Sequence, residues 1–324
     1  MREGLNARLL PAAALLLATT VSGRAEAQAW VAPQGEGFVG FGFQHTWANE
    51  HLSFEGKAVD CGTMRAESLH LLGGFVPIER LGLTVGVAFV ATKWTTHGSP
   101  YNPNGYKPHG PHDDGSWHAT MEDARLDVRY RLFDEPLLVT PLAGIVFPTH
   151  EYVTAGHAGT GRGFVEAPVG LYAGRLLDPL LPDAWLQARY AYTFVEHTQD
   201  METGETLNTN RSNLDVELGY FLTASLSARI LGAFQWGHGG LEDISVAGQE
   251  FEEHDRRLRA SWQKIGGGVT YSAGRVDVSF VALWTLGGKN TARWYTLAAA
   301  VAWNFGRENF ESILGTKTRP APSH

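Results

Sequence analysis

Residues 124–132 read ARLDVRYRL, and apolar and charged side chains alternate along this stretch. A period of two places alternate residues on opposite faces of a β-strand. One face is therefore small or oily, while the other carries Arg125, Asp127, Arg129 and Arg131. Such a strand fits a soluble antiparallel sheet with one wet face, or a membrane barrel with lipid outside and a polar interior. The rest of the sequence decides between the two.

The start of the chain has the pattern of a secretory signal peptide. A basic beginning precedes an apolar run at 9–21 and an Ala-Glu-Ala cleavage site at 25–27. This run is too short, and wrongly flanked, for a membrane-spanning helix. We therefore expect residues 1–27 to be removed, residues 28–305 to form the folded part and residues 306–324 to be a C-terminal periplasmic tail.

The composition excludes several classes of protein. The formal net charge is −8, so no broad basic surface for nucleic acid is expected. After the signal no run of about eighteen apolar residues occurs, which argues against membrane-spanning helices. Cys61 is the only cysteine, so an intrachain disulfide cannot form, and we expect an unpaired thiol in a polar loop.

The alternation of residues 124–132 recurs along the whole chain. Each alternating segment is near the ~9–11 residues that a tilted strand needs to cross a membrane. The twelve segments are 38–47, 65–75, 83–94, 124–132, 137–147, 164–174, 184–195, 213–222, 226–236, 259–271, 275–284 and 293–305.

The connections between these segments alternate in length. The short ones are 77–82, 133–136, 176–183, 223–225 and 272–274, and the long ones are 48–64, 96–118, 148–162, 196–211 and 237–257, with 287–291 the one short connection in the long-loop set. Short periplasmic turns and long extracellular loops are typical of outer-membrane barrels. The sequence thus predicts an all-β, transmembrane, antiparallel up-and-down barrel of about twelve strands in the outer membrane.

Aromatic residues fall where the segments meet their connections. Barrel girdles have this arrangement because a ring with a polar handle suits the headgroup layer of a membrane. The residues concerned are Trp47, Trp94, Tyr130, Tyr192, Trp236, Trp284 and Trp294.

The segment GIVFPTHEYVTAGHAGTGRGFVEAPVGLYAG at 144–174 resembles a family of outer-membrane proteins assigned to the MetA pathway of phenol degradation. The matching positions are Pro148 and Thr149 at a strand end, and Gly159 and Gly161 where the loop closes. The resemblance implies a barrel of about twelve strands that passes small, aromatic molecules across the outer membrane. The closing aromatic residues Trp303 and Phe305 resemble the signal by which the barrel-assembly machinery recognises its clients.

Parity predicts which side chains face the lumen. Burying a lone charge costs several kcal/mol or more, so the inward charges either line a wet passage as a selectivity filter or pair and plug it. We expect a narrow aqueous passage for an aromatic or anionic solute, constricted by an inward loop. The predicted lumen-lining residues are Glu67, Arg125, Asp127, Arg129, Arg131, Glu166, Arg175, Gln187, Arg189, Asp215, Glu217, Arg229 and Asp277.

Catalysis, metal binding and cofactors find little support in the sequence. The histidine-rich loop 96–118 matches no rigid metal site, and we expect a solvated loop there. No serine stands beside His45, His70 or His150 with an acid at an obvious spacing, so we expect no enzyme and no cofactor. Two alternatives remain: an outer-membrane hydrolase of lipid or peptide, marked by a Ser–His or Asp–His pair at the outer rim, and an adhesive barrel whose loops bind partners.

Overall fold

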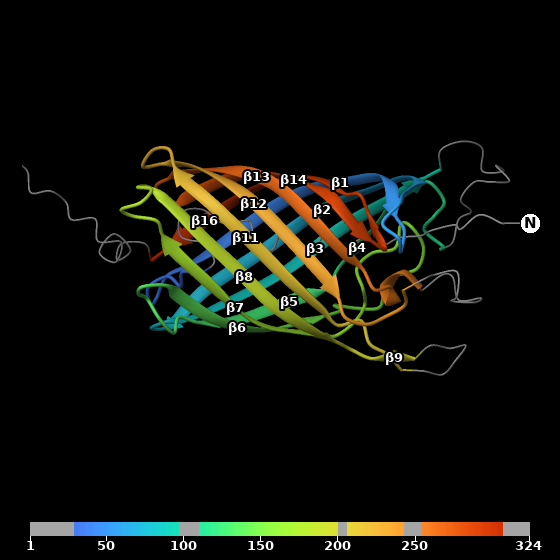
Figure 1. Cartoon of the computed structure of the whole chain (residues 1–324), viewed down its shortest axis with the longest axis horizontal. Helices are drawn as coiled ribbons and strands as arrows, with labels where there is room; N and C mark the ends of the chain where they lie inside the picture. The colour runs from blue at the N-terminus through green and yellow to red at the C-terminus, as the bar shows by residue number, and fades with distance from the viewer. Residues whose placement is uncertain (1–28, 97–109, 200–205, 243–253, 307–324) are drawn as a thin grey trace, which may run out of the picture.

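A computed structural model describes residues 29–96, 110–199, 206–242 and 254–306. The predicted signal peptide and nearly all of the predicted tail lie outside these residues. The described chain forms a closed antiparallel β-barrel with steeply tilted strands (Figure 1), which confirms the predicted fold class. Within the described residues no helix is long and apolar enough to cross a membrane.

Fourteen strands form one sheet, and two of them, β4 and β15, are short additions, which leaves twelve in the wall. The twelve are β1 (Gly37–Leu52), β2 (Ala58–Ile78), β3 (Leu81–Thr95), β5 (Ala124–Tyr130), β6 (Leu138–Phe147), β7 (Glu166–Leu176), β8 (Ala184–Val195), β11 (Arg211–Phe221), β12 (Leu226–Gly237), β13 (Ser261–Ala273), β14 (Val276–Lys289) and β16 (Tyr295–Phe305). The short elements are β4 (His118–Met121), β9 (Thr198–Gln199), β10 (Thr206–Leu207), β15 (Thr291–Ala292) and the 3₁₀ helix η3 (His254–Arg257).

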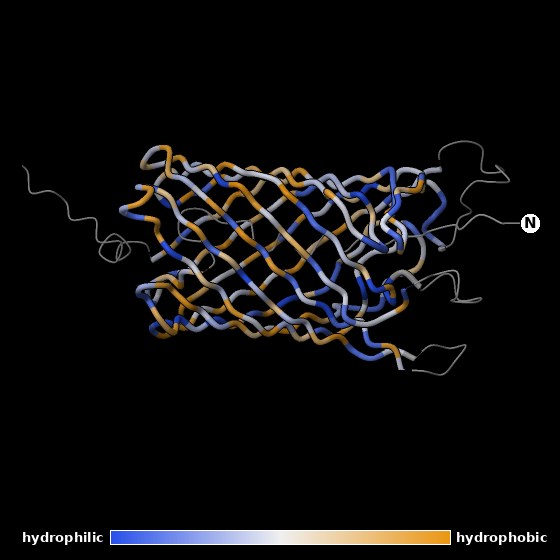
Figure 2. Tube along the Cα trace, viewed as in Figure 1, coloured by the Kyte–Doolittle hydropathy of each residue, from blue (hydrophilic) through white to orange (hydrophobic). Residues whose placement is uncertain are grey.

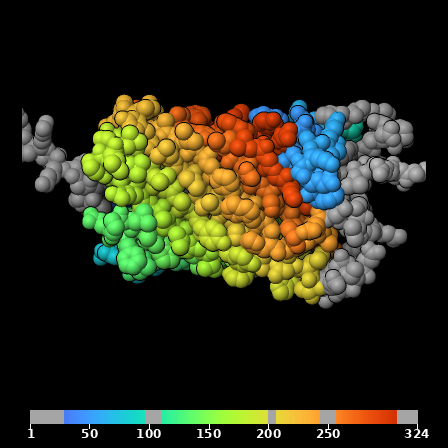
Figure 3. Space-filling view, viewed as in Figure 1, coloured from blue at the N-terminus to red at the C-terminus, as the bar shows by residue number. Residues whose placement is uncertain are grey.

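The cylinder closes where the first and last strands meet. Strand β1 pairs antiparallel with β2 on one side and with β16 on the other, so that Phe43 lies opposite both Leu69 and Ala299. Closure leaves no unpaired strand edge, which a barrel in lipid requires because hydrocarbon cannot hydrogen-bond to exposed backbone. On the face shown in Figure 3 the wall is continuous.

The wall is oily outside and polar inside. Along β1, the outward Phe41 and Phe43 are 56% and 51% exposed, whereas the inward Gln44 and Thr46 are each 1% exposed. The hydropathy colouring alternates in the same way around the barrel (Figure 2). Soluble proteins bury their large apolar side chains, so this inverted pattern selects the membrane barrel over the two-layer soluble sheet.

The two ends of the barrel differ as the loop lengths predict, with one correction. Short turns gather at the left end in Figure 1, and most longer connections gather at the right end. The predicted long connection 48–64 is wrong, because β1 and β2 extend until Leu52 pairs with Ala58 and only 53–57 remains as a turn. Cys61 therefore lies in β2, fully buried, and not in a polar loop.

Candidate functional site

The lumen wall from β5 to β12 is lined by ion pairs. Arg125 donates to Asp127 on its own strand, with Nη2 2.9 Å from Oδ1. Across the β8–β11 pair, Arg189 Nη1 lies 3.1 Å from Asp215 Oδ2. These carboxylates and guanidinium groups neutralise one another along the wall, because neighbouring strands place their inward side chains at the same height.

Two further contacts extend this charged half of the wall. Glu217 accepts a hydrogen bond from the Trp185 indole at 2.7 Å, and its other oxygen lies 3.9 Å from Arg229 Nε. The Tyr172 ring faces the guanidinium groups of both Arg129 and Arg189, each 5.9 Å from the ring centroid. An aromatic face adjacent to cations stabilises them by cation–π attraction.

Near the long-loop end the charges are most deeply buried. Arg211 holds Glu166 through two parallel hydrogen bonds of 2.9 and 2.5 Å, and both residues are at most 3% exposed. Arg162, from the loop before β7, adds a third contact to Glu166 at 3.6 Å. This bidentate geometry is the strong form of a charge-assisted hydrogen bond.

The opposite part of the wall, β13, β14, β16 and β1, is lined mainly by small, hydroxyl or aliphatic side chains. On β16 the inward positions include Ala298, Ala300 and Ala302, all buried, with Thr296 and Asn304 at either end. On β14, Val281 and Leu283 pack with Ala298 and with Leu231 of β12. The lumen is therefore two-sided: most of its charges lie in one half, and the facing half, apart from Lys264 of β13 and Asp277 of β14, carries small, hydroxyl or aliphatic side chains.

The structure places most of the predicted lumen residues on inward positions. Two are corrections: Glu67 shares the outward face of Leu69 and pairs with His45, and Arg175 lies opposite the outward Leu186. In both strands a charged residue occupies an outward position near a rim, where apolar residues no longer fill every outward position. The rule that charged residues face the lumen therefore fails for Glu67 and Arg175. The inward ones are Arg125, Asp127, Arg129, Arg131, Glu166, Gln187, Arg189, Asp215, Glu217, Arg229 and Asp277.

The long-loop end of the lumen is covered by the segment between β6 and β7. The Thr92 hydroxyl donates to the carbonyl of Ala158 at 2.5 Å, and His157 stacks on Trp94 at 4.7 Å between ring centroids. Trp94 and Trp294 are buried inside this cap at 1% and 3% exposure, so their assignment to a membrane girdle is wrong. An inward-folded loop thus narrows this end, as the sequence predicted.

An element that the sequence did not predict lies across the short-turn end. Residues 29–36, here called the N-terminal strap, precede β1 and pass through the barrel mouth. The strap ends at β8, which is six strands from β1 in either direction around the barrel. The Ala29 N–H donates to Gln187 Oε1 at 3.1 Å, and the Thr140 hydroxyl donates to the Ala29 carbonyl at 2.6 Å.

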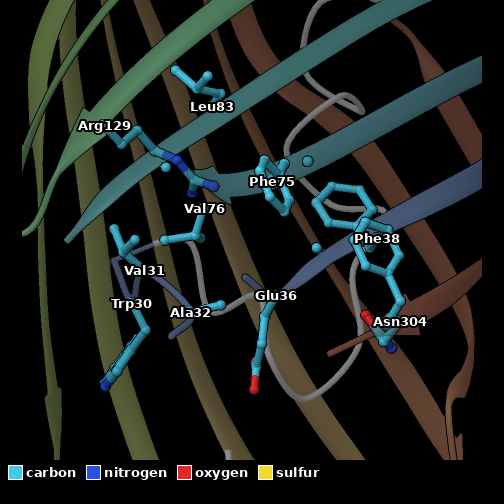
Figure 4. Close-up of a pocket in the computed structure, with 14 residues that line it drawn as sticks. Trp30, Val31, Ala32, Glu36, Phe38, Phe75, Val76, Leu83, Arg129 and Asn304 are labelled. Carbon is cyan, nitrogen blue, oxygen red and sulfur yellow. The ribbon is translucent and has the colours of Figure 1, made fainter. Parts of the chain in front are cut away.

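Glycine allows the strap to lie against the wall. A Cβ at Gly174 would stand 2.7 Å from Ala29 Cβ and 2.9 Å from the Trp30 ring, which is too close for any side chain. Between the strap and the wall lies a small hollow that is partly open to solvent. It is lined by Trp30, Val31, Phe38, Phe75, Phe305, Glu36 and Arg129 among others, and Figure 4 shows Arg129 extending toward Val76 and Phe75.

The described part of the histidine-rich loop is tied to the lumen cap. Asp113 accepts hydrogen bonds from the backbone N–H of His157 at 3.0 Å and of Ala158 at 2.8 Å. His118 lies 2.9 Å from Asp114, and this hydrogen bond lowers the pKa of Asp114. In the described residues no three potential ligands gather into a metal site; positions 97–109 lie outside them.

A Ser–His contact that sequence reasoning missed occurs at the outward rim. Ser212 Oγ lies 2.6 Å from His238 Nε2 and 2.9 Å from the Tyr190 hydroxyl, and His238 stacks on Tyr192. Within the described chain no acidic side chain hydrogen-bonds to His238. The two residues are 26 apart in the sequence, so only the pairing of β11 with β12 brings them together.

The fold is shared with solved outer-membrane proteins. The COG4313 outer membrane channel from Pseudomonas putida F1 matches with a TM-score of 0.61 at 12% identity, over 86% of this chain and 98% of that chain. The NanC porin matches with a TM-score of 0.46 at 10% identity, over 81% and 98%. The translocator domain of the autotransporter NalP from Neisseria meningitidis gives 0.47 at 10% identity, over 86% and 91%.

No protein-family model matches the sequence, and no curated protein matches it. The comparisons therefore establish the outer-membrane barrel fold, on the strength of the first of these structures. The resemblance carried by residues 144–174 stays a prediction. In the structure Pro148 and Thr149 follow β6, and Gly159 and Gly161 lie in the loop that enters the lumen.

Proposed function

We propose that the protein is an outer-membrane channel that admits a small amphipathic solute, aromatic or anionic, through the barrel. The observation that carries this proposal is the two-sided lumen. A solute with an apolar body and a charged or polar group finds small side chains along β16 and β14, and cations along β5 and β8. The similarity in fold to an outer membrane channel supports the same conclusion.

The two ends of the lumen set the size of the solute. The cap around Ala158 narrows the long-loop end, and the strap crosses the short-turn end. Because the contacts of the strap and the cap narrow the two mouths, we expect both segments to move when a solute passes. The lining of the hollow beside the strap offers Phe side chains to an aromatic ring and Arg129 to a carboxylate.

Conductance of the refolded protein in a planar bilayer tests the proposal. We expect wild-type protein to give small, discrete steps, and we expect Arg129→Gln combined with Arg189→Gln to lower the anion-to-cation permeability ratio. Arg175→Gln, which removes the same charge from the outer face, is the matched control and leaves the ratio unchanged. Absence of current, or a ratio indifferent to the lumen changes, would refute the charge-selective channel.

The Ser212–His238 contact is the observation that bears on the enzyme alternative. A serine nucleophile needs a base that is itself oriented by a third group, together with donors for the oxyanion. Here Tyr190 shares the Ser212 hydroxyl, and Ser212 is only 3% exposed. We assign the contact to the structure of the aromatic rim, and expect no labelling of Ser212 by a fluorophosphonate probe in lipid vesicles. Labelling that is lost in Ser212→Ala would establish a hydrolase instead.

A further inference from the structure

Near the long-loop end the outward face carries a row of side chains that includes two cations, which do not suit hydrocarbon. Near the long-loop end, four neighbouring strands place Tyr295, Trp47, Arg65 and Lys93 at one height, since Trp47 is opposite both Tyr295 and Arg65, and Arg65 is opposite Lys93. The row faces outward because it has the parity of the exposed Phe43, Leu69 and Phe89 on the same strands.

Two cations therefore stand directly opposite each other on adjacent strands. Side chains in such a pair have Cβ atoms about 4.5–5.5 Å apart, and like charges there destabilise the sheet. Among the described residues, neither the Arg65 nor the Lys93 side chain has an ion-pair or hydrogen-bond partner. Glu67 lies one outward row closer to the membrane centre, but its carboxylate is engaged by His45 Nδ1 at 2.6 Å. The arrangement calls for an anion from outside the chain.

The height of the row identifies where that anion comes from. Trp47 stacks on Tyr295 at 5.5 Å between centroids, and Trp284 lies opposite Tyr295 on the next strand. Trp117, immediately before β4, is also exposed. Outward aromatic residues at a barrel rim mark the headgroup layer of the membrane. With the long-loop end outside the cell, this layer is the headgroup region of the outer leaflet.

We propose that Arg65 and Lys93 bind a phosphate group of a phosphorylated glycolipid of the lipid A type in the outer leaflet. The guanidinium group matches two phosphate oxygens, and the ammonium group serves as a compact second charge. One phosphate bridging the pair removes the repulsion between the two cations. Trp47 beside them provides an apolar face for the sugar or the acyl chains. The inference rests on the outer-membrane placement proposed above. It does not require that the barrel conducts ions or admits a particular solute.

Binding of lipid A to the refolded full chain in detergent, counted as adducts by native mass spectrometry, tests the proposal. We expect Arg65→Gln combined with Lys93→Gln to weaken lipid A binding about tenfold, equivalent to about 1.4 kcal/mol. The matched control is Arg175→Gln, an exposed outward cation at the opposite rim, which retains wild-type binding. Lys93→Gln alone provides an intermediate loss should the double variant fail to refold.

Thermal unfolding provides a second measurement, in which lipid A reverses the order of stability of wild type and the double variant. Without lipid A, the double variant is more stable than wild type because the repulsion between the two cations is gone. With lipid A, wild type is the more stable protein. Equal binding of dephosphorylated lipid A by wild type, or unchanged binding by the double variant, overturns the proposal. Equal protection by inorganic phosphate assigns the pair to a soluble anion and also overturns it. A barrel that binds lipid A but conducts no ions refutes the channel alone.

Discussion

The two halves of the lumen wall are built from the same alternating strands, but their inward side chains make different kinds of contact. In the half from β5 to β12, buried carboxylates and guanidinium groups pair within and between strands, as with Arg211 and Glu166. In the half formed by β13, β14, β16 and β1, small side chains such as Ala298 and Ala300 leave the interior to packing. In the first half ion pairs fix the positions of the side chains, and in the second half the small side chains leave space for a solute.

The difference also explains where the N-terminal strap is anchored. Its far end is fixed by hydrogen bonds to Gln187 and Thr140 in the half from β5 to β12, which offers polar partners at that height. Its near end continues directly into β1. A backbone segment crossing a lumen needs partners for its N–H and C=O groups, and a wall of alanine supplies few.

The largest effect is expected from breaking the buried pair at the top of the charged half. Arg211→Ala leaves the Glu166 carboxylate buried with only the more distant Arg162, and removing one partner of a buried pair typically costs about 3–5 kcal/mol. We expect the free energy of unfolding, measured in urea with refolded protein in lipid vesicles, to fall by that order. Arg211→Leu combined with Glu166→Leu removes both charges and should recover most of the loss; an equal loss in both variants would contradict the pairing.

A second change tests the half with small side chains. Ala300→Trp places a large ring into the lumen, and because the clearance of a pore determines its conductance, we expect current below about a tenth of wild type. Ala299→Trp is the matched control, since Ala299 is the next residue on β16 and faces outward opposite Phe43. If both variants conduct alike, solute does not pass along this half.

The third prediction concerns the strap. Thr140→Val combined with Gln187→Ala removes two hydrogen bonds to Ala29, each contributing about 1 kcal/mol. We expect the strap to leave the mouth more often, so that closed dwell times in single-channel recordings shorten by about thirtyfold. Thr270→Val is the control, because Thr270 is a buried threonine at the same end whose hydroxyl has no hydrogen-bond partner among the described residues. Unchanged dwell times would exclude the strap as the gate.

The smallest effect is expected at the loop above the lumen cap. Burial and the neighbouring His118 lower the pKa of His112, so the folded loop favours the neutral imidazole. Because the opened loop binds a proton more readily, acidification through and below the ordinary histidine pKa of 6.5 should loosen residues 110–118. Hydrogen exchange of these amides, corrected for intrinsic rates, should speed up at pH 5 relative to pH 7.5. In His112→Gln this pH dependence should vanish.

The strand pattern could be predicted almost in full because each spanning strand has an unambiguous side-chain alternation between lipid and interior. Residues 184–195, for example, form β8 with the predicted bounds. Errors arose where that alternation is broken near a rim, as at Glu67 and Arg175, or where a strand continues beyond the membrane, as at Cys61. Outside the hydrocarbon layer neither face of a strand has to be apolar, so the alternation no longer indicates which side chains face the lumen.

By itself the sequence determined the all-β barrel, its number of spanning strands and most inward-facing charges. Lipid admits strands only as a closed barrel, and the alternating segments can be counted along the chain. Only the tertiary structure decided which charges pair, that the N-terminal strap crosses the mouth, that Ser212 meets His238, and that Arg65 and Lys93 stand together on the outer face. Each of these depends on strand register and on contacts between residues far apart in the chain, and alternation along one strand carries no information about either.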